Sequence, residues 1–254
     1  MFKKLKLAIG SYLVAHRFIF KHKIWAYAII PTCINILLLS GIFYGAYQLN
    51  DTLKPNIQSW FTEDQNTLST ITTYTIQILV NILLFIVYFF TYKNLVLIIL
   101  SPFLALLSEK VDALYTGREF PFNGKQLMID TWRGIKISIR NTFIELSLIV
   151  ICIGIGFFFP IIGLAIPVIV FLIESFYFGF SMIDYTNERK KLSFTESKHY
   201  IKRNKPLAYG IGIVFYLMFL IPIIGWIFAP LYGIVAGTLA VLQNDKTQAP
   251  YTNE

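Results

Sequence analysis

The sequence predicts an all-α integral membrane protein that forms a single membrane domain over residues 1–254. Hydrophobic residues make up 56% of the chain, and the mean hydropathy of +0.63 is too high for a soluble globule. Residues 24–48 and 65–92 contain no charged side chain, and each run exceeds the roughly 20 helical residues that cross a hydrocarbon core. Two further apolar stretches are interrupted by proline and glycine. We therefore expect two long tilted transmembrane helices, two partly penetrating helical hairpins and an N-terminal amphipathic helix.

The N-terminal segment, residues 1–23, carries six lysines or arginines and no acidic residue. It has no clear small-residue cleavage site, and His16 and Arg17 interrupt its apolar stretch, so a signal peptide is not expected. We interpret it as an amphipathic helix on the membrane surface, with its basic side chains near lipid phosphates. The alternative is a solvated basic leader that fixes the topology of the chain.

The distribution of charge predicts the orientation. Residues 108–140 hold six basic and four acidic side chains, and residues 186–206 hold seven basic and two acidic ones, whereas residues 51–64 hold one lysine and three acids. By the positive-inside rule, the N-terminus and the basic segments are cytoplasmic and the acidic loop is outside. Residues 24–49 then cross outward, and a long helix over 66–115, bent near Pro102, returns.

Two apolar hairpins are expected, over residues 141–184 and 207–243. Their turns are the stretches "FPIIGLAIP" at 159–167 and "IPIIGWIFAP" at 221–230, which contain no charged residue. One interpretation is that both hairpins enter from the cytoplasm and turn within, or near the far edge of, the bilayer, as broken helices on substrate pathways do. The other is two ordinary hairpins with short external turns. Gly41-xxx-Gly45 and Gly233-xxx-Gly237 also match the pattern that lets membrane helices pack closely.

An ordered set of motifs indicates a family. The motifs are "IIPTCINILLLSGIFY", "SPFLALLSEKVDALYTG", "FPIIG", "SMIDYTNERKKLSFTES" and "IPIIGWIFAPLYGIVAGTLAV", and they lie between residues 10 and 246. Together they resemble the CysZ-type sulfate permeases, whose broader family includes the etoposide-induced membrane proteins. The resemblance implies a multi-pass protein of the bacterial inner membrane that assembles into oligomers and takes up sulfate for cysteine synthesis.

The resemblance also implies a substrate site at the start of the first membrane helix, where the family has a small residue, an aliphatic residue and an arginine. Here those positions are Lys23, Ile24 and Trp25, so tryptophan stands in place of the arginine. With the nearby Lys21, these residues are the candidate substrate-binding group, because a helix N-terminus and lysines both favour a dianion. The alternative is that a snorkelling lysine and a tryptophan anchor the helix at the interface.

Ionisable side chains within or beside the apolar segments are candidates for an anion pathway or its gate. Burying such groups in lipid is costly unless they are paired or hydrated. Glu109 and Asp112 share a helix face and could reach Arg133 or Arg140. Arg140 and Asp184 lie near the base of the first hairpin and could pair, and Glu174 lies within that hairpin. The group comprises Glu109, Asp112, Arg133, Arg140, Glu174 and Asp184. These residues could instead be structural ion pairs, and a proton-coupling role for Glu174 is a hypothesis.

The remaining motifs do not point to an enzyme. The sequence contains no zinc-protease, nucleophile-elbow or phosphate-loop motif, and Cys33 and Cys152 lie within apolar runs. We expect no cofactor, no metal and no nucleic-acid partner. The leading hypothesis is therefore a permease for sulfate or a related anion, alternatively a non-transporting membrane protein that organises partners or lipids. The missing arginine favours the second, whereas Glu174 and the broken hairpins favour the first.

Overall fold

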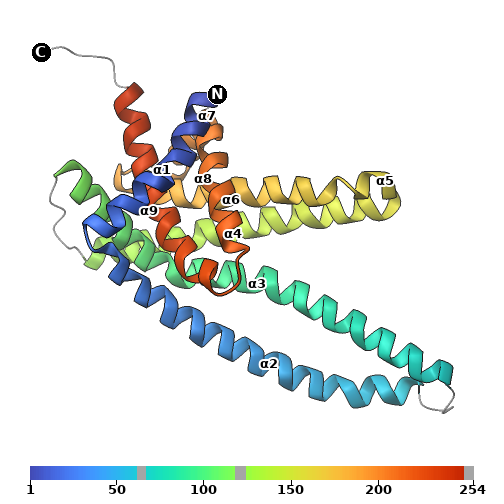
Figure 1. The fold of residues 1–254 in the computed structure, drawn as a ribbon. Helices are drawn as coiled ribbons and strands as arrows, with labels where there is room; N and C mark the ends of the chain where they lie inside the picture. The colour runs from blue at the N-terminus through green and yellow to red at the C-terminus, as the bar shows by residue number, and fades with distance from the viewer. Residues whose placement is uncertain (62–66, 118–123, 249–254) are drawn as a thin grey trace, which may run out of the picture. The chain divides into compact units, whose positions relative to one another are not determined.

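The computed structural model describes residues 1–61, 67–117 and 124–248, and every regular element in these ranges is a helix (Figure 1). The predicted all-α class is confirmed. Four helical stretches in the described ranges are long and apolar enough to cross a membrane, namely Ile24–Leu49, Thr131–Gly156, Ile166–Arg189 and Ile224–Thr247. The chain divides into two compact units, Cys33–Val96 and a larger unit formed by Met1–Thr32 and Leu97–Glu254.

The smaller unit consists of parts of two long helices, α2 (Ile29–Phe61) and α3 (Thr67–Thr116), which run antiparallel. The Tyr92 hydroxyl of α3 donates a buried hydrogen bond of 2.6 Å to Asn35 Oδ1 of α2. The predicted first crossing, 24–49, has the same bounds as the apolar span Ile24–Leu49, and α2 continues beyond that span to Phe61. A helix satisfies its own backbone hydrogen bonds in water as well as in lipid, so charged residues mark the end of the apolar span and not the end of the helix.

Helix α3 is continuous over 50 residues, as predicted for 66–115, and Pro102 lies inside it. At 1.5 Å per residue its length is about 75 Å, more than twice the thickness of a hydrocarbon core. Its C-terminal part, from Leu97 onward, belongs to the larger unit. Glu109 and Asp112 lie on that part of α3 and therefore belong to the larger unit.

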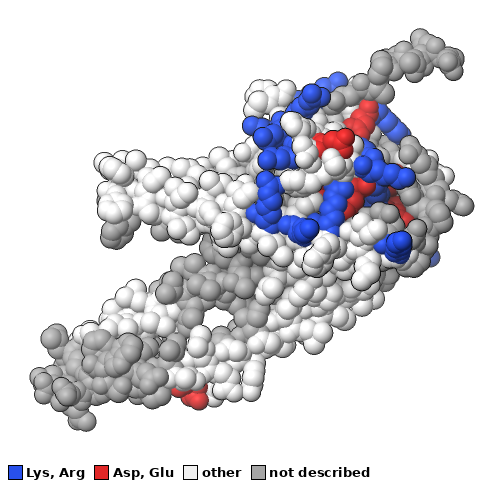
Figure 2. Space-filling model, turned by 180° about the vertical axis from the view of Figure 1, so that it is seen from behind, with Lys and Arg blue, Asp and Glu red and all other residues white. Residues whose placement is uncertain are grey.

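The first hairpin of the larger unit is formed by α4 (Gly124–Phe158), the single turn α5 (Pro160–Gly163) and α6 (Ile166–Arg189). No charged residue lies between residues 147 and 173, and Ile161 and Leu164 at the turn are 88% and 84% exposed. Figure 2 shows lysines and arginines gathered over the other end of this unit, whereas the arm of the hairpin carries none. An exposed apolar tip opposite a charged base fits a hairpin that enters the bilayer from one side.

The second hairpin is formed by α8 (Lys205–Phe219) and α9 (Ile224–Gln248), which follow the short helix α7 (Phe194–Arg203). Helix α8 has 15 residues and is therefore about 22 Å long, less than the roughly 30 Å of the hydrocarbon core. The turn between α8 and α9 places Ile223 in the left-handed backbone region, at φ 64°. The short first arm is as expected for a hairpin that penetrates only part of the membrane.

Helix α6 packs against α4, α8 and α9, and its closest approach is to α8. Two glycines make this approach possible. A Cβ atom added to Gly212 of α8 would lie 1.5 Å from the carbonyl oxygen of Ser175, and one added to Gly179 of α6 would lie 1.8 Å from that of Ala208. The two helix backbones are therefore in direct contact, which only glycine permits at these positions.

The predicted N-terminal amphipathic helix is α1 (Phe2–Lys21), and its buried face packs against α8 and α9. The Tyr12 hydroxyl donates a 2.8 Å hydrogen bond to the carbonyl oxygen of Ile211, and His16 Nδ1 lies 2.7 Å from the Tyr232 hydroxyl. The opposite face exposes Phe2 and other apolar side chains beside lysines. Contact of that exposed face with the membrane surface stays a prediction.

Candidate functional site

An ion-pair cluster lies at the base of the first hairpin, between α4 and α6. Arg133 of α4 lies 3.6 Å from a carboxylate oxygen of Asp184 and 3.6 Å from one of Glu188, both on α6. Its Nη1 donates a 2.6 Å hydrogen bond to the carbonyl oxygen of Leu192, which follows α6. Asp184 and Glu188 are four residues apart and therefore share the helix face that meets the arginine.

Two donors of the Arg133 guanidinium group are buried without a hydrogen bond to any described residue. Both ion pairs are longer than a hydrogen bond, and Nε and Nη2 of Arg133 have no hydrogen-bond partner among the described residues. A guanidinium group presents five N–H donors in a planar fork that suits an oxyanion. Arg133 is thus held in position by its neighbours, and because Nε and Nη2 are buried, an anion could use them only where a carboxylate moves aside.

A second cluster joins α6 to the C-terminal part of α3. Arg189 lies 3.3 Å from a carboxylate oxygen of Glu109 and donates hydrogen bonds to the Ser108 hydroxyl, at 3.3 Å, and to the carbonyl oxygen of Ala105. Asp112 lies within electrostatic range of the same guanidinium. Because the Arg189 side chain is only 9% exposed, these interactions are largely protected from solvent.

These clusters bring together four of the six predicted pathway residues, but with partners that differ from the expected ones. Glu109 pairs with Arg189 rather than with an arginine of α4, and Asp184 pairs with Arg133 rather than with Arg140. Arg140 instead places its guanidinium carbon 4.6 Å from the centre of the Phe194 ring. Seven residues, or about two helical turns, separate the two arginines of α4, so they meet different parts of α6 and α7.

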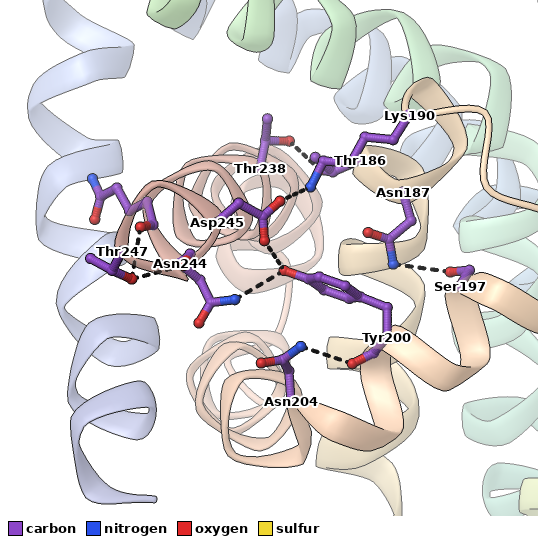
Figure 3. Close-up of polar contacts among 11 residues, drawn as sticks. Thr186, Asn187, Lys190, Ser197, Tyr200, Asn204, Thr238, Asn244, Asp245 and Thr247 are labelled. Carbon is purple, nitrogen blue, oxygen red and sulfur yellow. Dashed lines mark hydrogen bonds and ion pairs between the residues drawn. The ribbon is translucent and has the colours of Figure 1, made fainter. Parts of the chain in front are cut away.

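A polar network connects these clusters to α7 and α9. The Ser197 hydroxyl donates to Asp184. It also accepts a 3.0 Å hydrogen bond from the amide of Asn187 (Figure 3). The Ser108 and Thr238 hydroxyls lie 2.9 Å apart, and Thr186 donates to Thr238 at 3.2 Å. The buried ends of α3, α6, α7 and α9 are therefore joined by side-chain hydrogen bonds, which fix the ion pairs in place.

Farther along the same face of α7, Tyr200 links this helix to α9. Its hydroxyl donates to Asp245 at 2.7 Å and accepts from the Asn244 amide at 3.1 Å (Figure 3). Burial and the nearby Asp245 carboxylate raise the pKa of the Tyr200 hydroxyl well above its usual range, so the hydroxyl stays protonated and keeps donating. Lys190 also pairs with Asp245, which ties the end of α6 to the same point.

Glu174 lies inside the first hairpin and is only 1% exposed. Glu145 of α4 is also buried, and both carboxyl groups lie within electrostatic range of the Tyr216 hydroxyl on α8. Two carboxyl groups near one hydroxyl form a second buried polar region, away from the arginine clusters. The sequence indicated Glu174 as a buried acid, but the convergence of three helices on it is visible only in the structure.

The predicted substrate-binding group lies at the break between α1 and α2. Lys23 has φ 53°, in the left-handed region, and precedes a 3-10 helix over Ile24–Ala28. Ile24 is fully buried, whereas Trp25 is 54% exposed and the lysines at 21 and 23 are exposed. The candidate site is therefore an exposed, basic turn that one buried aliphatic side chain anchors.

The exposed turn is positioned near α3 by Tyr27. The Tyr27 ring lies 6.2 Å from the Phe103 ring, and the Lys110 ammonium lies 5.2 Å from the centre of the Tyr27 ring. The turn and the ion-pair clusters thus both contact the C-terminal part of α3, but no hydrogen bond or ion pair joins them among the described residues. They are separate groups in the structure.

Sequence reasoning missed Arg189 and Glu188 as members of the site. Both lie in the stretch "SMIDYTNERKKLSFTES" that was used as a family motif, and the spacing Asp184–Glu188 is a helical i, i+4 repeat of acids. That repeat was the feature of the sequence from which Glu188 could have been identified. No group of three His, Cys, Asp or Glu side chains that could hold a metal ion occurs in the part of the chain that the structure describes.

Comparison with known families gives one match over most of the chain. Residues 11–230 match the family described as Sulfate transporter CysZ/Etoposide-induced protein 2.4. Proteins named Sulfate transporter CysZ are similar to this chain. That of Pectobacterium atrosepticum is 26% identical over 207 residues, which cover 80% of this chain and 73% of the relative. That of Vibrio parahaemolyticus is 24% identical over 235 residues, which cover 89% and 90% of the two chains.

Proposed function

The chain belongs to the Sulfate transporter CysZ/Etoposide-induced protein 2.4 family, and from this premise we propose that it is a permease that carries sulfate across a membrane. The observation that carries the proposal is the family match over residues 11–230, together with relatives that are named sulfate transporters and cover most of the chain. The four apolar spans and the uncharged hairpin support a multi-pass membrane protein.

The finer assignments are proposals. We propose that the protein lies in the bacterial inner membrane and assembles as a homo-oligomer. Its uptake of sulfate would supply cysteine synthesis. The N-terminus and the charged base of the larger unit face the cytoplasm, because lysines and arginines gather there (Figure 2). The basic turn of Lys21, Lys23, Ile24 and Trp25 is the substrate-binding site at the cytoplasmic end of the pathway, where two ammonium groups attract the dianion.

The ion pairs at the base of the first hairpin form the gate. Arg133 is held by Asp184 and Glu188, and Arg189 is held by Glu109. Sulfate can use these guanidinium groups only by exchanging with a carboxylate, because four acids, Asp112 included, face only two arginines. Because Arg133 makes no hydrogen bond to either of its carboxylates, it is the first point of exchange. Such an arrangement lets an anion bind but keeps the bound state weak enough for release.

Within this proposal Arg140 contributes positive charge at the mouth, and Glu174 is the site where a proton would couple to transport. Glu174 is well placed for this role because it is buried and, like Glu145, lies within electrostatic range of the Tyr216 hydroxyl.

The test is uptake of radiolabelled sulfate into liposomes that contain the purified protein, with chloride and phosphate as competitors. Saturable uptake above empty liposomes is expected, and a Lys23→Ala variant should raise the concentration that gives half-maximal uptake several-fold. The matched control is Lys202→Ala, which removes an exposed lysine from α7. A folded protein that moves no sulfate would overturn the proposal and would favour a non-transporting membrane protein that organises partners or lipids.

A further inference from the structure

A pocket of about 420 Å³ opens on the outer face of α4, where it meets the start of α7. Three cationic side chains line it, Arg133, Lys136 and Arg140, and the rest of its wall is apolar and includes Trp132 and Phe194. The cations are three and seven residues apart, so all three lie on one face of the helix. A pocket with both a cationic row and apolar walls fits an amphiphilic anion better than an inorganic one.

Two of the three cations have their charge available for a ligand. Arg133 is engaged by Asp184 and Glu188, but Lys136 and Arg140 are exposed, and neither forms an ion pair with a carboxylate in the part of the chain that the structure describes. Arg140 lies against Phe194, with its guanidinium carbon 4.6 Å from the ring centre. The aromatic ring fixes the guanidinium at the pocket wall and leaves its N–H donors free to face a ligand.

The position of the pocket indicates the kind of ligand. The apolar span Thr131–Gly156 begins at the pocket, so the pocket lies at the level where a membrane helix leaves the headgroup region. Trp132 is 61% exposed, as is typical of a side chain at the membrane interface. About two and three turns beyond Trp132, Ile139 and Phe143 are also exposed and offer an apolar track along α4.

We propose that this pocket binds an anionic phospholipid, with the headgroup phosphate between Lys136 and Arg140 and the first part of an acyl chain along the exposed apolar face of α4. The cations supply the charge that attracts a negative headgroup, and the apolar wall excludes a fully hydrated ion. Because α4 also carries Arg133, the bound lipid fixes the helix that holds the carboxylate pairs. Binding of a lipid at this pocket does not depend on whether the protein transports sulfate.

The experiment measures binding of phosphatidylglycerol and phosphatidylcholine with identical acyl chains to the full-length protein in a non-ionic detergent, by native mass spectrometry. We expect phosphatidylglycerol to bind more tightly, and the double variant Lys136→Ala/Arg140→Ala to weaken its binding about tenfold or more, since each basic residue near a headgroup contributes about 1 kcal/mol. The matched control is Lys202→Ala/Arg203→Ala, which removes the same two charges from the exposed end of α7 and should keep the preference.

Three results would overturn the proposal. An equal loss of phosphatidylglycerol binding in both double variants would mean that the lipid responds only to the net charge of the protein. Displacement of the lipid by sulfate, but not by chloride at equal ionic strength, would assign the pocket to an inorganic anion. If the pocket variant fails to fold, bromine-labelled phosphatidylglycerol provides the test. It should quench the tryptophan fluorescence of the unmodified protein more than that of Trp132→Phe. Equal quenching of the two proteins would refute the site.

Discussion

The contact between α6 and α8 is tight enough that adding one methyl group should disrupt it. The perturbation is Gly212→Ala. The new Cβ atom would lie 1.5 Å from the carbonyl oxygen of Ser175 and 2.9 Å from the amide nitrogen of Gly179. Since real Cβ contacts essentially never fall below 3.0 Å, the two backbones must separate by at least about 1.5 Å, the difference between 3.0 and 1.5 Å.

The expected cost lies at the upper end of the range for overpacking, about 3 kcal/mol, because a backbone carbonyl cannot rotate away as a side chain can. At roughly 2–4 °C per kcal/mol for a chain of this size, the melting temperature should fall by about 6–12 °C. The lost contact also moves α6, which carries Asp184 and Glu188, so sulfate uptake by the folded fraction should fall as well.

The assay is thermal unfolding of the detergent-solubilised protein, followed by the monodisperse fraction that remains after heating. Gly154→Ala is the matched control, because a Cβ at Gly154 of α4 meets no atom within 4 Å and alanine favours a helix over glycine. The reasoning would be refuted if both variants melted within about 2 °C of the unmodified protein. It would also fail if the control lost as much stability as Gly212→Ala.

Three further predictions concern charged groups. Arg133→Lys, which keeps the charge but removes the fork that faces Asp184 and Glu188, should lower sulfate uptake about tenfold at unchanged expression, and unchanged uptake would remove Arg133 from the gate. Glu174→Gln should flatten the pH dependence of uptake, and an unaltered profile at every pH would exclude proton coupling through this residue. Hydrogen bonds from the Ser193 hydroxyl and then from its backbone N–H hold the pKa of Glu196 below its ordinary value of 4.5. The stability that Glu196 adds is therefore present above that value and is lost as pH falls through the lowered pKa, so Glu196→Ala should lower the melting temperature at pH 7 and have no effect at strongly acidic pH.

The capping box at the start of α7 explains why the effect of Glu196→Ala arises at this helix end. Ser193 and Glu196 exchange hydrogen bonds in which the backbone N–H of each residue is satisfied by the side chain of the other. The measurement is the melting temperature of Glu196→Ala and of the unmodified protein at several pH values from neutral to acidic. The change of their difference with pH gives the sign of the pH dependence. A difference that grows as the pH falls would contradict the assignment.

Some features of the site were predictable because they depend on residues close together in the chain. The uncharged runs, the two broken hairpins and the continuous helix over 66–115 follow from hydropathy and from the positions of proline and glycine, which act locally. That Glu109 and Asp184 would have charged partners was predictable for the same reason, since an acid in or beside an apolar stretch needs a partner. The identity of each partner was not predictable. Arg189 meets Glu109 across 80 residues of sequence.

The sequence by itself determined the all-α membrane class, the family, the long third helix and the presence of an apolar hairpin with a charged base. Only the tertiary structure decided which arginine pairs with which acid, because the level at which α4 packs along α6 and α7 places Arg133 beside Asp184 and Arg140 beside Phe194. It also decided which glycines matter. The Gly41 and Gly45 pair meets nothing within 4 Å among the described residues, whereas Gly179 and Gly212, which are on different helices, bring two backbones into contact. Small-residue spacing permits close packing, but the crossing of the helices determines where it occurs.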